Sequence, residues 1–369
     1  MSVYSGKGKA QSGMDRQKRH LRTYLVVAIS VSVAAIIAIS FLTMDRDTSR
    51  AVSRIDVLSF VVVLGLVAGK WLSECLRFSL IIKAIGRHLP FGQTSNAVLG
   101  SAFTGAVTPY RSATVPAQVF FFTRYGLSGS EATAVSTTGA GLSVLMLTVT
   151  MPLVLIMTAS RIHLSLGMRA LLVMGAAIGL FVFLFAIYSM RDPSRVSRML
   201  ERVIPRYLRK KPWFDRMKEH LTKGMGDFSA SLHSLLRSKK STLAWIVLLT
   251  AFYWLSEVFV ASWILRGLGF PQYFWTALLA QVVVSSILPF TPVPGESGVA
   301  EATFAGVFSI FIARDVVALV TVAWRFFMFY LPLALLGTAF IMATNDAGRL
   351  GREQEVVERH AVQPAVEKL

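Results

Sequence analysis

Ionisable side chains inside otherwise apolar stretches are the first residues here that could do chemistry. The tetrapeptide Trp-Leu-Ser-Glu occurs twice, at residues 71–74 and 254–257, so the carboxylates of Glu74 and Glu257 stand 183 positions apart. A charged side chain at the centre of a membrane costs at least ~2.5–3.5 kcal/mol on insertion scales, and it indicates a functional site by default. We therefore take both carboxylates as candidate binding residues.

Cations close to these carboxylates leave a structural alternative open. Lys70, Glu74 and Arg77 are spaced four and three residues apart, which puts them on one helical face. An ion triad that only stabilises the helix is therefore an alternative to a binding site. Glu257 has no cation one helical turn before it, and we expect Arg325, deep in the last apolar block, to be its partner.

Prolines interrupt two of the apolar blocks, which predicts two broken helices. A proline in a helix interior costs about 3 kcal/mol, so each block must break near its middle. Each half has only about 15 residues and is too short to cross a bilayer. Broken backbone at membrane depth is tolerated where it is buried in protein or lines a water-filled cavity. The predicted break residues are Pro109, Pro116, Pro292, Pro294, Gly295 and Gly298.

The polar residues near these breaks suit an anionic lipid headgroup. Arg111 lies in the first break, and arginine binds phosphate and carboxylate groups in a bidentate manner. Glu296 and Glu301 at the second break either balance the nearby cations or bind a coupling cation or a proton. The predicted substrate-binding residues are Glu74, Arg111, Gln118, Glu257, Glu301 and Arg325, and we predict no catalytic residue and no metal ligand.

The composition places these residues in a membrane protein. The chain has 369 residues, of which 54% are hydrophobic and 16% charged, and its mean hydropathy is +0.58. The net charge of +18 comes from basic residues between apolar runs, which is typical of cytoplasmic loops and does not indicate nucleic-acid binding. Cys75 is the only cysteine, so no intrachain disulfide forms, and the six histidines show no metal-ligand spacing. We expect no cofactor.

Charge also predicts the topology. Residues 1–23 carry six Lys/Arg and one Asp, and we expect a disordered cytoplasmic tail followed by a first transmembrane helix at 24–43, in preference to a cleaved signal peptide. Residues 191–240 carry 14 Lys/Arg and 5 Asp/Glu and must also be cytoplasmic. If block 94–124 crossed the membrane once, this basic segment would lie outside. Block 94–124 is therefore predicted to be a re-entrant hairpin that enters and leaves from the cytoplasmic side, and block 273–312 one that enters from outside.

The expected fold is therefore an all-α polytopic membrane protein with an inverted repeat, six full spans and two re-entrant broken-helix hairpins. Between Trp71–Gln118 and Trp254–Glu301, 12 of 48 aligned residues are identical, which indicates a duplicated unit. Opposed copies with broken helices are typical of transporters. About eight hydrophobic blocks give the expected segments: 1–23, 24–43, a first repeat at 57–190, a linker at 191–241, a second repeat at 242–343 and a cytoplasmic tail at 344–369.

The linker at 191–241 is basic and amphipathic. Two locations fit this pattern: the anionic cytoplasmic leaflet of the membrane, and the underside of the helical bundle. The other expected partners are a membrane lipid and either a second copy of the chain or a lipid-modifying enzyme.

The break motifs resemble those of a known family. Residues 292–302, PVPGESGVAEA, are similar to the signature P-x-P-G-x-x-G-x-x-E of the flippase-like lysylphosphatidylglycerol synthase transmembrane family. Residues 108–120 are similar to its first motif, although Ala113 and Thr114 stand where the family usually has glycines. Residues 323–337 are similar to its last helix. The resemblance covers about 57–343 and implies the handling of phospholipid or polyisoprenoid-type molecules, without the aminoacyl-transferase domain of the full synthase.

We expect a non-enzymatic, flippase-like protein of the cell membrane, with both termini cytoplasmic, that translocates or exports such a lipid. The sequence has no P-loop, GxSxG or HExxH motif. Two alternatives stay open: a membrane subunit of an aminoacyl- or glycosyl-transfer enzyme, and a structural membrane partner without transport.

Overall fold

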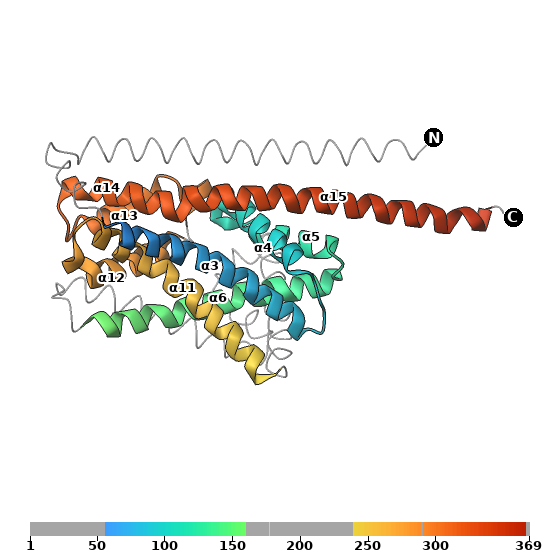
Figure 1. Ribbon diagram of the computed structural model, residues 1–369, viewed down its shortest axis with the longest axis horizontal. Helices are drawn as coiled ribbons and strands as arrows, with labels where there is room; N and C mark the ends of the chain where they lie inside the picture. Colours follow the sequence, from blue (N-terminus) through green and yellow to red (C-terminus); the bar gives the residue numbers. More distant parts are fainter. Residues whose placement is uncertain (1–55, 160–176, 178–238, 289–290, 367–369) are drawn as a thin grey trace, which may run out of the picture. The chain divides into compact units, whose positions relative to one another are not determined.

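The computed structural model describes residues 56–159, 177, 239–288 and 291–366. These residues form helices joined by short turns, and no strand occurs among them (Figure 1). Three helical stretches in this part are long and apolar enough to cross a membrane: Val57–Ala84, Lys240–Gly267 and Val316–Leu350. The chain is an all-α membrane protein, as predicted. The predictions for residues 1–23, 24–43 and 160–190, and for the linker at 191–241 apart from its last three residues, lie outside the described residues.

The helix boundaries repeat with the same offset as the sequence. Helix α3 is Val57–Ala84 and helix α11 is Lys240–Gly267; both have 28 residues, and adding 183 to the bounds of α3 gives the bounds of α11. Helices α4 (Phe91–Ala106) and α12 (Phe274–Ile287) also begin 183 residues apart. The duplication seen in the sequence is therefore matched in the local structure.

A glycine with positive φ follows both α3 and α11. Gly86 and Gly269, which are equivalent in the repeat, have φ of 78° and 89°. A residue without Cβ adopts this left-handed conformation at little cost, and it is typical of a glycine that follows a helix. The N–H groups of the next residues, Arg87 and Phe270, donate back to helix carbonyls at 3.2 and 2.9 Å. A glycine kept in both copies thus explains why both helices stop at equivalent positions.

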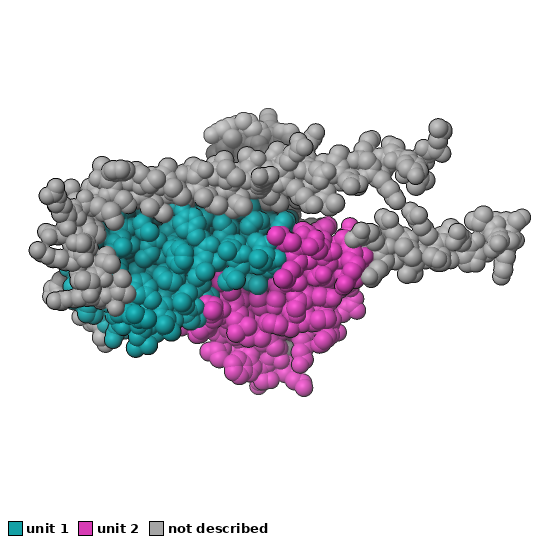
Figure 2. Space-filling view, turned by 45° about the horizontal axis from the view of Figure 1, so that its top comes forward, with its two compact units in different colours: residues 1–67, 99–117, 258–340 teal, residues 68–98, 118–257, 341–369 magenta. Residues whose placement is uncertain are grey.

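The described residues belong to two compact units, coloured separately in Figure 2. Unit 1 comprises residues 1–67, 99–117 and 258–340, and unit 2 comprises residues 68–98, 118–257 and 341–369. Each unit thus takes segments from both copies of the repeat.

In unit 2, α3 and α11 run antiparallel. Lys70 of α3 forms an ion pair with Glu257 of α11. Seven residues later on α3, a guanidinium nitrogen of Arg77 lies 3.5 Å from the hydroxyl of Thr250, which is seven residues earlier on α11. Because the positions advance along one helix as they retreat along the other, the two equivalent helices point in opposite directions.

Helix α6 (Gly129–Ala159) packs on α3 in the same unit. The guanidinium of Arg77 donates a hydrogen bond to the hydroxyl of Ser143 at 2.9 Å. Gly139 lies against the ring of Phe78, and a Cβ at this position would be 2.2 Å from a ring carbon. The missing side chain at 139 therefore permits the close approach of α6 to α3.

In unit 1, a stack of aromatic rings connects α13 (Val299–Phe308) with α14 (Arg314–Arg325). The ring of Phe304 is stacked between those of Phe308 and Trp324, with centroid distances of 3.9 and 4.4 Å. All three side chains are buried. Helix α12 also packs against α13. The stack supports the segment that joins α12 to α13, which contains the second proline break.

Helix α14 continues through a π-helical turn at Phe326–Tyr330 into α15 (Leu331–Val366). Pro332 has no backbone N–H to bond with the carbonyl four residues earlier, and the wider turn lies directly before it. Arg325 is the last residue before this turn. Such single π-turns inside α-helices are frequently found at functional sites.

Helix α15 extends beyond the predicted end of the last block. The sequence places a tail after residue 343, whereas the helix continues to Val366. Residues 349–363 are mostly good helix formers such as Arg, Glu, Gln and Leu, and Pro364 comes only at the end. Hydropathy marks where an apolar block ends, but a helix can continue into polar residues.

Candidate functional site

The two proline-containing segments interrupt their helices and lie side by side in unit 1. The first forms a 3-10 turn at Pro109–Arg111, between α4 and α5 (Thr114–Arg124), and the second forms one at Pro294–Glu296, between α12 and α13. The N–H of Tyr110 donates to the carbonyl of Thr291 at 3.3 Å. A backbone hydrogen bond therefore joins the two interruptions directly.

The individual prolines differ in their roles. Pro109 and Pro294 each start a 3-10 turn, where a missing N–H is tolerated. Pro292 lies in the extended stretch before the second turn. Pro116, predicted as a break residue, lies instead in the first turn of α5, where its N–H would have no helical partner.

Side-chain hydrogen bonds close the turn after α4. The hydroxyl of Thr108 donates to the carbonyl of Thr104 at 2.9 Å and accepts from the N–H of Ala113 at 3.3 Å. At Gly105, a Cβ would lie 1.9 Å from the hydroxyl of Thr114. Close approach at the first break therefore depends on Gly105, whereas the family motif has its glycines at the positions of Ala113 and Thr114.

Both breaks have a strained backbone. Among the described residues other than glycine, positive φ occurs at Tyr110 (55°), Arg111 (52°) and Glu296 (56°). The neighbouring Gly295 and Gly298 also have positive φ, 65° and 79°. A non-glycine residue in this region costs of order 1–3 kcal/mol, and such residues cluster at functional sites and switch regions. The strain in this part of the protein is thus concentrated where the two breaks meet.

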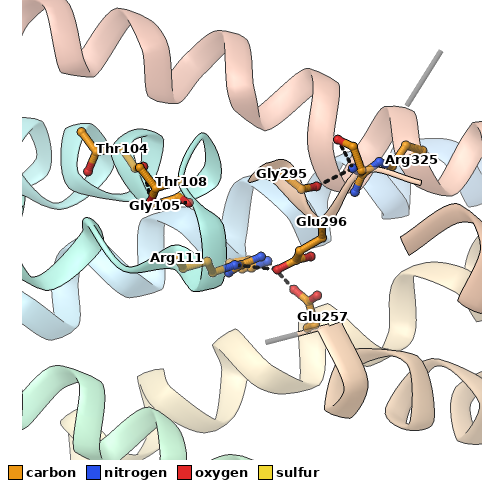
Figure 3. A network of polar contacts seen from close by, with 10 residues as sticks. Thr104, Gly105, Thr108, Arg111, Glu257, Gly295, Glu296 and Arg325 are labelled. Carbon is orange, nitrogen blue, oxygen red and sulfur yellow. Dashed lines mark hydrogen bonds and ion pairs between the residues drawn. The ribbon is translucent and has the colours of Figure 1, made fainter. Parts of the chain in front are cut away.

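An ion pair connects the breaks and involves two of the strained residues. Nε of Arg111 donates to Oε1 of Glu296 at 2.9 Å, and Figure 3 shows the two side chains reaching toward each other from the two turns. The Arg111 side chain is 59% exposed, whereas that of Glu296 is only 10% exposed. The cation of this pair is accessible and the anion is held inside the protein.

A second, buried pair fixes the shape of the second break. Nη2 of Arg325 donates to the carbonyl of Gly295 at 2.6 Å (Figure 3). Nε of Arg325 lies 2.7 Å from a carboxylate oxygen of Glu301. The other oxygen of Glu301 accepts from the N–H of Gly298 at 2.7 Å. The side chains of Arg325 and Glu301 are 3% and 0% exposed. Together they hold the backbone on both sides of Glu296.

Glu74 and Glu257, the repeated carboxylates, each pair with a cation of α3 in unit 2. Glu74 accepts from Arg77 at 2.7 Å, and Glu257 pairs with Lys70. The expectation that Glu257 would pair with Arg325 is corrected, and the predicted triad of Lys70, Glu74 and Arg77 is divided between two carboxylates. The side chains of Glu74 and Glu257 are 15% and 17% exposed.

Gln118, the remaining predicted binding residue, lies on α5 and is 5% exposed. It stands 183 residues before Glu301, so an amide in the first copy corresponds to a buried carboxylate in the second. Leu142 occupies the position equivalent to Arg325. The side-chain amide of Gln118 is neutral and needs no arginine, whereas the charged carboxylate of Glu301 is paired with Arg325.

The break motifs and the membrane helices agree with the comparison to known proteins. The family model described as "Lysylphosphatidylglycerol synthase TM region" matches residues 25–335. The chain belongs to this family. It is also similar to a UPF0104 membrane protein of Archaeoglobus fulgidus, with 24% identity over 311 residues that cover 83% of this chain and 92% of that relative. The range matched by the family model includes both breaks, the two Trp-Leu-Ser-Glu motifs and Arg325.

In this lysylphosphatidylglycerol synthase TM-region protein, sequence reasoning found part of the site. It offered Glu296 and Glu301 as possible partners of the nearby cations, and the structure contains both pairs, with Arg111 and Arg325. It missed the pairing of Lys70 with Glu257, because the register between two antiparallel helices is not encoded in spacing along either one. It also missed the turn made by Thr104, Gly105 and Thr108, although a threonine hydroxyl in a helix commonly bonds the backbone carbonyl four residues earlier.

Proposed function

We propose that this protein is a flippase-like membrane protein that translocates or exports a phospholipid or polyisoprenoid-type lipid. The observation that carries the proposal is the meeting of the two breaks in unit 1, where strained backbone from both copies of the repeat is joined by the Arg111–Glu296 pair. Irregular backbone and ionised groups are costly within a membrane, and they mark the substrate pathway of membrane transporters.

The proposed architecture is an inverted repeat with six full spans and two re-entrant hairpins, both termini being cytoplasmic. Its support is that α3 and α11, whose bounds differ by 183 residues, run antiparallel in unit 2. In transporters with inverted repeats, broken helices of both copies meet near the membrane midplane and alternating access moves one copy against the other. The linker at 191–241 would rest on the anionic cytoplasmic leaflet.

Five of the predicted binding residues divide into three roles under this proposal. Arg111 contacts the headgroup, because it is the accessible cation at the breaks. Glu74 and Glu257 are partly exposed, and we assign them to the path along which the polar headgroup passes. Arg325 and Glu301 are positioning residues, because both are buried and hold the backbone of the second break.

The test is a scrambling assay in proteoliposomes that contain a fluorescent phosphatidylglycerol or polyprenyl phosphate. The purified protein should expose inner-leaflet lipid to an external quencher faster than protein-free vesicles do. Gly298→Leu should abolish this activity, because φ of 79° excludes a side chain without strain. Gly306→Leu is the matched control, since Gly306 has an ordinary φ and open space around it. Scrambling at the protein-free rate for every lipid tried would contradict the proposal.

The family description favours a second candidate, a membrane subunit of a lipid-modifying aminoacyl- or glycosyl-transfer enzyme. In that case the partner of the chain is the enzyme, and a homo-oligomer is not required. Affinity purification from native membranes, followed by a transfer assay with radiolabelled aminoacyl-tRNA or nucleotide sugar, separates the two candidates. Co-purifying transfer activity together with absent scrambling would favour the subunit.

A further inference from the structure

Among the ion pairs of the described residues, Arg111–Glu296 combines an accessible cation with backbone strain at both residues. The guanidinium is 59% exposed, the carboxylate is 10% exposed, and both residues have positive φ. Part of the attraction between the two groups is offset by the cost of this backbone conformation, which is of order 1–3 kcal/mol for each residue. An anion that binds Arg111 and lets its backbone relax therefore competes with a weakened pair.

The geometry of the pair fits such competition. Nε of Arg111 donates a hydrogen bond to Oε1 of Glu296 at 2.9 Å. A guanidinium carries five N–H donors in a fixed planar fork and prefers bidentate binding of a phosphate or a carboxylate. A phosphate carries two or three terminal oxygens and can bind two N–H donors of an arginine at once, so it can compete with the carboxylate of Glu296 for Arg111.

The surroundings keep Glu296 in place as a competitor. Arg325 and Glu301 hold Gly295 and Gly298, the residues that flank the glutamate, through buried contacts of 2.6 and 2.7 Å. The carboxylate therefore stays close to the breaks when a ligand displaces it, and it is ready to pair again. An internal competitor of this kind weakens binding of the ligand and accelerates its release.

We propose that Arg111 is the binding residue for the phosphate of the lipid headgroup, and that Glu296 is an internal competitor which sets the rate of release. This inference rests on the proposed function and names the part of the lipid that the site recognises. The step is an exchange of ion pairs: the bond between Arg111 and Glu296 is replaced by one between Arg111 and the phosphate, and no covalent bond changes.

The exchange predicts opposite effects for the two halves of the pair. Arg111→Gln removes the phosphate ligand and should weaken binding of phosphate lipids by at least about 10-fold, a change typical for the loss of a charge-assisted hydrogen bond. Glu296→Gln removes the competitor and should strengthen binding by about 10-fold. A pair that only holds the two breaks together predicts weaker binding in both variants, because either change would loosen the breaks.

The experiment measures lipid binding to the purified full-length protein in micelles of an uncharged detergent, by native mass spectrometry. The probes are dioleoyl phosphatidic acid, dioleoyl phosphatidylglycerol and dioleoylglycerol, which carry a phosphomonoester, a phosphodiester and no phosphate. Arg124→Gln is the matched control, because it removes another arginine of the same broken block, one whose guanidinium lies over the ring of Phe120 at 5.5 Å. Size-exclusion profiles and melting temperatures confirm that each variant is folded.

Opposite shifts in Arg111→Gln and Glu296→Gln for both phosphate lipids, with dioleoylglycerol unaffected, would support the proposal. Shifts in the same direction, or wild-type binding in Arg111→Gln, would overturn it. Added inorganic phosphate distinguishes the source of the oxyanion: competition at equimolar concentration would assign the site to soluble phosphate and overturn the lipid assignment. Opposite shifts in a protein that fails to scramble lipid would refute translocation alone, and scrambling with unshifted binding would refute this inference alone.

Discussion

At the scale of single residues, burial decides how much an ion pair contributes. Arg325 and Glu301 are almost fully buried, whereas the pair of Arg87 and Glu131 at 3.0 Å is 48% and 30% exposed. Breaking a buried pair leaves an uncompensated charge and costs about 3–5 kcal/mol, while an exposed pair is worth about 0–1 kcal/mol. Two glutamates of the same protein are therefore expected to respond very differently to the same substitution.

We predict that Glu301→Gln destabilises the protein by about 3–5 kcal/mol, because Arg325 is left charged and buried. Glu131→Gln should leave stability almost unchanged, because its pair with Arg87 is exposed to solvent. Thermal unfolding of the two purified variants in detergent measures the difference. Replacing both partners, as in Arg325→Met with Glu301→Leu, should restore much of the stability and still impair scrambling, because the carbonyl of Gly295 loses its donor. Equal melting temperatures for the Glu301 and Glu131 variants would show that the buried pair does not stabilise the break.

The repeated carboxylates give a second prediction at this scale. Each neutralises one cation of α3, so Glu74→Gln and Glu257→Gln leave Arg77 or Lys70 without its carboxylate in a largely buried setting. We expect the scrambling rate to fall at least about 10-fold in each variant, which corresponds to a rise of about 1.4 kcal/mol in the activation free energy. The proteoliposome assay, normalised to inserted protein, measures this. An unchanged rate in the double variant would assign both carboxylates to architecture.

At the scale of elements, the sequence predicted interruptions at Pro109 and Pro294, because prolines and glycines act on the backbone locally, but it also predicted one at Pro116, which lies in the first turn of α5. It did not predict the wide turn after Arg325 or the length of α15. The turn depends on how the chain accommodates Pro332, and the helix end depends on propensity, which hydropathy does not measure. The sequence also did not predict the close contact at Gly105, because the neighbouring atom belongs to Thr114 on the other side of the turn.

The contact between Gly105 and Thr114 gives a prediction about the first break. A Cβ at 105 would lie 1.9 Å from the Thr114 hydroxyl and 3.2 Å from its Cβ. Gly105→Ala should therefore displace the start of α5 and destabilise the protein by about 1–3 kcal/mol, as overpacking does. Removing the hydroxyl in Gly105→Ala with Thr114→Ala should restore most of that loss in thermal unfolding. The matched control is Gly92→Ala, since no atom lies within 4 Å of a Cβ at Gly92. Failure of Thr114→Ala to rescue would mean that the clash is not what limits this turn.

At the scale of the whole molecule, sequence and structure inform different parts of the topology. The charges that orient the chain lie mainly in residues 1–23 and 191–240, and the structure describes only residues 239 and 240 of these. The structure instead shows that α3 and α11 oppose each other, which the sequence could reach only through charge arithmetic. The charges assign the sides of the membrane, and the helix contacts assign the relative direction of α3 and α11.

The sidedness of the loops is therefore the prediction that tests the architecture as a whole. Cys75 is buried, so Cys75→Ala gives a background without cysteine in which single cysteines report their own location. If the basic segments are cytoplasmic, Ser128→Cys and Ser238→Cys should react with a membrane-impermeant maleimide only after the cells are opened. Ser49→Cys, in the neutral segment before α3, should react in intact cells. The assay needs scrambling activity in the Cys75→Ala background as its control for correct folding. Labelling of Ser238→Cys in intact cells would place the linker on the external side of the membrane. The antiparallel direction of α3 and α11 would then have to come from an arrangement other than two re-entrant hairpins.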